Sequence, residues 1–159
     1  MGTDTGQNQL ASRLRQHFFN ENKDRSVFRK NIGRALLAKA HDAFAAQWEI
    51  DLTSRAARER WGDRVNKQKL AEVEALVTDY MRHNLSFVTL QVDDPAERLS
   101  TESKLISTLS LCEECMPSKE WLGNYSPKEK IRESGLWLVN ELYKTPLSEK
   151  ELAQLERAT

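Results

Sequence analysis

Arg13 and His17 are the first residues along the chain whose types and spacing could do chemistry. They stand four positions apart in the segment LASRLRQHFF, residues 10–19, so on a helix both side chains project from one face. Apolar residues recur every four positions along the same segment and predict its buried side: Leu10, Leu14 and Phe18. An arginine and an imidazole at the margin of a core have two interpretations, a solvated helix flank or a site for a phosphate.

Glu102 is a second candidate because it stands among apolar residues. In the helix predicted over residues 95–111 it follows Leu99 by three positions and precedes Ile106 by four, which places its carboxylate in an apolar stripe with Leu109. A carboxylate that faces the interior is costly unless it is paired or binds a cation. One interpretation is an ion pair with an arginine such as Arg13. The other is a divalent metal site, because one carboxylate can hold Mg²⁺ together with waters and a substrate phosphate.

Cys112 and Cys115 form a C-x-x-C pair that offers little chemistry. A structural zinc site needs four ligands, and the sequence holds no second C-x-x-C. His41 and His83 do not stand at a ligand-like spacing from the cysteines. We therefore interpret the pair as two ordinary thiols near a helix end.

The elements that must position these residues are mostly helices. Apolar periodicity and capping residues predict helices over 7–19, from 26 onward, over 67–82 and 95–111, and two more that begin near 126–129 and 148–151. Residues 85–92, LSFVTLQV, alternate like a strand and are rich in strand-forming residues. Only residues 134–143 offer a second strand, and that stretch could equally be a helix. The sequence therefore predicts one good strand without an obvious partner.

The segment 41–66 reads as a charged, partly helical insertion. It carries Trp48 and Trp61, which we expect to pack against the domain rather than bind a ligand.

Composition narrows the function only broadly. The chain has 159 residues, enough for one domain, and its 24 Lys and Arg equal its 24 Asp and Glu. Zero net charge gives no global attraction to nucleic acid or membrane, so phosphate binding must come from a local patch. The sequence has no membrane span or signal-peptide core, so the default expectation is the cytoplasm.

Three stretches together resemble the later parts of a GIY-YIG nuclease domain: LASRLRQHFFNENKDRSVFRKNIGRALL, SFVTLQVDDPAERLSTESKLISTL and PSKEWLGNYSPKEKIRESGLWL. The family's first helix carries an Arg and, four residues on, a His or Tyr, which Arg13 and His17 match. Its third strand is similar to residues 86–92. The helix that follows supplies a metal-binding Glu, which Glu102 matches.

The resemblance implies an α+β fold, mostly helical, with the remnant of a small antiparallel sheet packed by helices. The two tyrosine-bearing strands that name the family have no counterpart before the first helix here. We therefore expect a single GIY-YIG-like domain over residues 1–159 that is N-terminally incomplete, with an insertion at 41–66.

The resemblance also implies a metal-dependent DNA endonuclease that hydrolyses phosphodiester bonds with Mg²⁺ or Mn²⁺. Glu102 would bind the metal, Arg13 would stabilise charge on the phosphate, and His17 would position water or transfer a proton. Further DNA contacts are expected from four residues: Arg15, Arg29, Lys30 and Asn124. Without the tyrosines we expect weak DNA binding and little or no cleavage. The alternatives are a non-catalytic nucleic-acid-binding remnant and a helical protein-interaction module, in which Arg13 and Glu102 form a structural pair.

Overall fold

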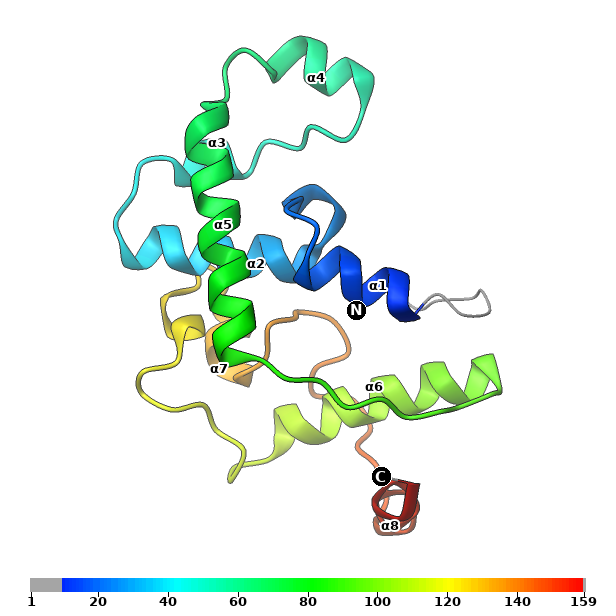
Figure 1. Cartoon of the computed structure of the whole chain (residues 1–159). Helices are drawn as coiled ribbons and strands as arrows, with labels where there is room; N and C mark the ends of the chain where they lie inside the picture. Colours follow the sequence, from blue (N-terminus) through cyan, green and yellow to red (C-terminus); the bar gives the residue numbers. More distant parts are fainter. Residues whose placement is uncertain (1–9, 159) are drawn as a thin grey trace.

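The computed structural model describes residues 10–158, and the elements it contains there are helical. They are α1 (Leu10–Phe18), η1 (Lys23–Arg25), α2 (Val27–Lys39), α3 (Ala45–Trp48), α4 (Arg55–Trp61), α5 (Lys67–Asn84), α6 (Pro95–Leu111), η2 (Leu122–Tyr125), α7 (Glu129–Ser134) and α8 (Glu149–Ala158). Figure 1 shows α5 crossing α2, with α4 near one end of α5 and α6 near the other. The predicted start of the first helix at residue 7 lies outside the described residues.

Capping side chains start the main helices where the sequence predicts them. Ser26 Oγ accepts a hydrogen bond from the backbone N–H of Arg29 and caps α2. Asp94 caps α6 in the same way, with Pro95 in the first turn. At the start of α8 the Glu151 carboxylate accepts the backbone N–H of Ser148, 2.8 Å away, which completes a capping box. These three predicted helix starts are confirmed.

The core lies where α2 and α5 cross. α5 contributes Val73, Val77 and Met81, each at most 2% exposed. From the segment 41–66, the predicted insertion, Phe44, Trp48 and Val65 also belong to this core. The segment is therefore packed into the domain at both of its ends.

Trp48 is the central side chain of this core. It is fully buried, and its indole N–H donates to the carbonyl of Lys30 at 3.0 Å. Gly33 on α2 lies against the indole, and a Cβ there would come within 2.2 Å of the ring atom Cζ2. The close approach of α2 to Trp48 therefore requires glycine. The prediction that Trp48 packs against the domain is confirmed, whereas Trp61 on α4 is only partly buried.

The predicted α+β fold with a sheet remnant is wrong for the part of the chain that the structure describes. Residues 85–92 form no strand, and Phe87 and Val88 are 58% and 77% exposed. The backbone groups of residues 86–91 make no hydrogen bond to any described residue. The second candidate strand, at 134–143, is split between the end of α7 and turns. Strand propensity alone gives no sheet, because each strand needs a partner for its backbone groups.

The apolar stripes predicted on the first and fourth helices are also less buried than expected. α1 has no fully buried residue, and its Leu10 is 54% exposed. On α6 only Ile106 and Ser107 are buried, while Leu99 and Leu109 are 48% and 39% exposed. Both helices therefore lie on the surface of the molecule. No helix among residues 10–158 is long and apolar enough to cross a membrane.

Candidate functional site

Arg13 and His17 lie on α1 with their side chains half-buried. The Arg13 guanidinium donates to Gln16 Oε1 at 3.4 Å. His17 Nδ1 lies 2.7 Å from Ser26 Oγ, and the imidazole packs against the Phe28 ring in a T-shaped arrangement. Burial, and next the charge of Arg13, lower the pKa of His17 below 6.5. The lowered pKa favours the neutral imidazole, and its Nε2 forms no hydrogen bond with a described residue.

Ser26 gives the imidazole a structural role as well. The same Oγ that contacts His17 accepts the backbone N–H of Arg29, at the start of α2. Because Arg29 holds Ser26 Oγ in place, the contact between Ser26 Oγ and His17 Nδ1 fixes the orientation of the imidazole between the end of α1 and the start of α2. A fixed, neutral imidazole with one uncommitted nitrogen suits proton transfer, and it equally suits a packing role.

Glu102 lies half-buried on α6. Neither a hydrogen bond nor an ion pair joins its carboxylate to another residue in the range 10–158, so the ion pair with Arg13 is not formed. No group of three His, Cys, Asp or Glu side chains that could hold a metal occurs among the described residues. A free, accessible carboxylate fits a cation that takes one protein ligand and completes its shell with waters and a phosphate. It does not form an all-protein metal cage.

The structure does not join the three predicted catalytic residues directly. Figure 1 shows α1 and α6 on the same side of α5, but no hydrogen bond or ion pair links Arg13 or His17 to Glu102. Cys112 and Cys115 follow α6 as free thiols.

Arg29, predicted to contact DNA, is instead at the centre of a buried network. Its Nε and Nη2 donate to Glu74 Oε2 at 3.0 and 2.8 Å. Its Nη2 also donates to Thr78 Oγ1, and its Nη1 donates to the carbonyl of His17. Glu74 Oε1 accepts the backbone N–H of Lys23. Because Arg29 is fully buried and ties α1, α2 and α5 together, its side chain does not reach a DNA phosphate in this structure.

Two other predicted DNA contacts are committed to neighbouring backbone. Lys30 Nζ donates to the carbonyl of Glu49 at 3.2 Å. The Asn124 amide donates to the carbonyls of Ser118 and Lys119 at 3.1 and 3.0 Å, which closes the loop before η2. Arg15 is exposed beside an apolar groove. The other residues lining that groove are Ala11, Leu14, Phe18, Phe19, Arg82 and Phe87.

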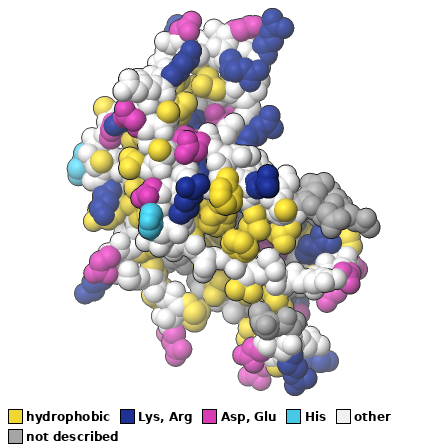
Figure 2. All heavy atoms as spheres, in the orientation of Figure 1, with side chains coloured by type: hydrophobic (Ala, Val, Ile, Leu, Met, Phe, Trp, Pro, Cys, Tyr) yellow, Lys and Arg dark blue, Asp and Glu magenta, His cyan; other side chains and the backbone are white. Residues whose placement is uncertain are grey.

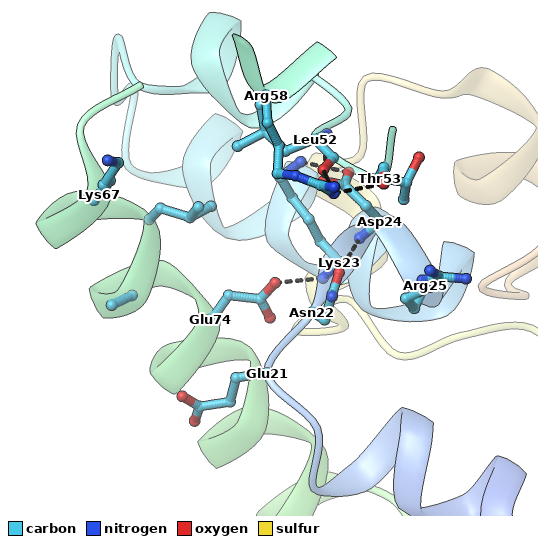
Figure 3. Close-up of a pocket in the computed structure, with 12 residues that line it drawn as sticks. Glu21, Asn22, Lys23, Asp24, Arg25, Leu52, Thr53, Arg58, Lys67 and Glu74 are labelled. Atoms are coloured by element: carbon cyan, nitrogen blue, oxygen red, sulfur yellow. Dashed lines mark hydrogen bonds and ion pairs between the residues drawn. The ribbon is translucent and has the colours of Figure 1, made fainter. Parts of the chain in front are cut away.

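A polar pocket, which the sequence analysis did not identify, lies between η1, the start of α5 and the segment before α4 (Figure 3). Lys23 is buried at its base, where Nζ donates to Asp24 Oδ1 and to the carbonyl of Ile50, both at 2.6 Å. Three exposed cations also line the pocket: Arg25, Arg58 and Lys67. Arg58 lies between the other two in Figure 3.

Charge is divided unevenly along the chain, although its sum is zero. Residues 10–69 contain 14 Lys and Arg against 7 Asp and Glu, whereas residues 70–158 contain 10 against 16. Figure 2 shows Lys and Arg side chains gathered at the end of the molecule where Figure 1 places α4. A count of charge by segment would have pointed to this basic region, which the total conceals.

Comparison with known proteins gives one match. Neither the curated proteins nor the solved structures contain a match to the chain. A family model described as the GIY-YIG domain matches residues 2–159, which confirms the resemblance drawn from the sequence. The match includes the segment 41–66 as well as Arg13, His17 and Glu102. The chain therefore belongs to the GIY-YIG family of nuclease-type domains.

Proposed function

We propose that this chain is a metal-dependent DNA endonuclease domain whose phosphodiester site uses Arg13, His17 and Glu102. The observation that carries the proposal is the family match, which runs over residues 2–159 and so includes all three. The free carboxylate of Glu102 and the neutral imidazole of His17 are the structural features that support it.

Each residue has a distinct role in this proposal. Glu102 holds Mg²⁺ or Mn²⁺, which supplies Lewis-acid polarisation of the phosphate when it is bound. Arg13 places its guanidinium against the phosphate oxygens and stabilises the charge that develops on them. His17, oriented through Ser26, uses its Nε2 to position the attacking water or to take its proton.

The lack of a direct bond between Glu102 and α1 limits the expected rate. Since no hydrogen bond or ion pair holds Glu102 against Arg13 or His17 in residues 10–158, a bound DNA phosphate would have to bring the three side chains together. Misplacement of a catalytic group by about 1 Å can cost about a hundredfold in rate. We therefore expect weak binding and slow cleavage from this chain.

A non-catalytic nucleic-acid-binding domain is the second candidate. It is supported by the basic character of residues 10–69. The two candidates differ in whether a cation-dependent cleavage step follows binding.

The deciding experiment measures nicking of supercoiled plasmid and binding of a fluorescent duplex by the same purified protein. Mg²⁺, Mn²⁺ and EDTA are compared for the wild type, Glu102→Gln and the control Glu97→Gln, an exposed carboxylate on the same helix. We expect slow, cation-dependent nicking that Glu102→Gln abolishes and Glu97→Gln retains, with DNA binding kept in both variants.

Two other outcomes contradict the proposal in different ways. DNA binding by the wild type without any cation-dependent nicking would leave the non-catalytic domain as the function. Nicking that persists in Glu102→Gln would remove Glu102 from the site.

A further inference from the structure

α4 and its flanks carry a set of exposed cations that no buried network explains. We name this set the α4 surface, and it consists of Arg58, Arg60, Arg64 and Lys67 with Arg25 of η1 beside them. All five side chains are exposed. None of them forms an ion pair with a described carboxylate, and the ion pair within α4 joins Arg55 to Glu59. Their charge is therefore available to a ligand.

Local contacts hold three of these cations in place. Arg58 Nη1 donates to the carbonyls of Leu52 and Thr53 at 3.1 and 2.6 Å, so its Nε and Nη2 remain uncommitted to described residues. The guanidinium carbons of Arg60 and Arg64 lie 4.9 and 5.1 Å from the centre of the Trp61 ring. Stacking on an aromatic ring limits the conformations of each guanidinium and leaves its edge N–H groups outward.

The α4 surface continues into the polar pocket of Figure 3. Arg58 and Lys67 line that pocket from α4 and α5, and Arg25 lines it from η1. The acidic residues of the pocket are mostly committed inside the protein. Asp24 pairs with Lys23 at 2.6 Å, and Glu74 pairs with Arg29 at 2.8 Å. Only Glu21 among the lining carboxylates is exposed, where its side chain accepts from Thr78 Oγ1.

The side chains exposed around α4 distinguish between two anionic partners, a lipid bilayer and a nucleic acid. No large apolar side chain in the range 28–75 is exposed, and Trp61 is partly buried, so the α4 surface presents no exposed apolar side chain for insertion into a lipid bilayer. Several exposed arginines that present N–H groups around α4 suit the repeated phosphates of a nucleic acid backbone.

We infer that the α4 surface is a second, non-catalytic site that binds the phosphate backbone of nucleic acid, separate from Arg13, His17 and Glu102. The inference deepens the proposed function, because it rests on nucleic acid being the ligand. The α4 surface positions the duplex through contacts to phosphates and carries no base readout.

The test compares two triple variants that remove equal charge. Arg58→Gln/Arg60→Gln/Arg64→Gln changes the α4 surface. The matched control, Lys119→Gln/Lys130→Gln/Lys150→Gln, changes three exposed lysines in the acidic part of the chain. Anisotropy of a labelled duplex and of a labelled single strand is measured with each protein across a salt series, and circular dichroism verifies the fold.

We expect the α4 variant to bind about tenfold more weakly at moderate salt and to lose about two to three units of the slope of log affinity against log salt. The control variant should keep the wild-type slope. Lys67→Gln alone, which changes no stacking contact, should weaken binding about threefold and serves if the triple variant fails to fold. Comparing the affinity for the duplex with the affinity for the single strand shows which form of nucleic acid supplies the phosphates that the α4 surface binds.

Equal loss of affinity in the two triple variants would overturn the inference, because it would show a general charge effect. Unchanged duplex affinity, combined with loss of binding to phosphatidylserine vesicles, would assign the α4 surface to a membrane instead. Failure here is distinguishable from failure of the proposed function. At saturating DNA the α4 variant should retain cation-dependent nicking, whereas Glu102→Gln should bind normally without nicking.

Discussion

The helices α2 and α5 are held together by a different kind of contact from the helices α6 and α8. Between α2 and α5 lie a continuous apolar core and the buried Arg29–Glu74 pair. α6 buries only Ile106 and Ser107. It is joined to the C-terminal segment mainly by polar bonds: Ser103 to Glu141, Lys104 to Glu151, Thr108 to Leu147 and Ser110 to Tyr143.

This difference indicates which helices resist local unfolding and which helices unfold locally more easily. Buried apolar contacts give α2 and α5 cooperative stability, whereas partly exposed polar bonds give α6 and α8 a lower local free energy of opening. Glu102 stands in the weaker region and Arg13 lies beside the stronger one. The predicted catalytic residues are therefore divided between parts of unequal rigidity.

The largest expected effect of a single substitution is that of Glu74→Ala. Removing this carboxylate leaves the Arg29 guanidinium buried without its charge partner and releases the backbone of Lys23. The free energy of unfolding should fall by about 3–5 kcal/mol, as is typical when one member of a buried ion pair is removed. Urea denaturation followed by circular dichroism measures it. The control Glu72→Ala, an exposed residue on the same helix, should change little, and equal losses would contradict a special role for the buried pair.

A smaller effect is expected from the pH dependence of His17. Because the pKa of His17 in the folded chain lies below its ordinary value of 6.5, the unfolded chain binds a proton more readily. The contribution to stability is present above pH 6.5 and is lost as pH falls from 6.5 toward the lower folded pKa. His17→Gln should flatten the dependence of unfolding free energy on pH in this window. His83→Gln, an exposed residue on α5, should leave the slope as in the wild type.

The smallest effect is a local one at α8. The bond from Lys104, followed by the two from Ser148, lowers the pKa of Glu151 to about 2. The stabilisation of α8 should therefore be present above about pH 4.5 and be lost as pH falls toward 2. In Glu151→Gln, the amides of α8 should exchange hydrogen faster at neutral pH while those of α5 keep the wild-type rates. Hydrogen exchange with mass spectrometry distinguishes the two helices, and faster exchange in both would show that α8 supports the core.

The helix starts that the structure confirms were predicted from residues close to each other in the sequence. Ser26, Asp94 and Ser148 begin helices because each cap depends on residues within a few positions of it. The alternation of residues 85–92 expresses a local strand preference, but the strand that it predicted is not formed among the described residues. The prediction failed because a strand also depends on a partner, which local sequence does not supply.

Long-range pairing explains why local sequence does not show how Arg29 and Glu102 are placed in the fold. Nothing within a helical turn of Arg29 reveals that its partner is Glu74, 45 residues further on. The apolar stripe that includes Glu102 is less buried than predicted, because periodicity shows which residues share a face and does not show whether another element covers that face. The basic α4 surface was missed for a different reason, because the charge was summed over the whole chain.

The extended segment before α6 has a consequence for handling the protein. Its exposed Phe87 and Val88 stand in a stretch whose backbone donors and acceptors are unpaired within the described residues. An open, apolar, strand-forming segment of this kind is a template on which a second chain can add. We therefore expect these few residues to set the highest protein concentration that can be reached before the chain aggregates. A single lysine in place of Val88 should improve its colloidal behaviour more than any change to the core.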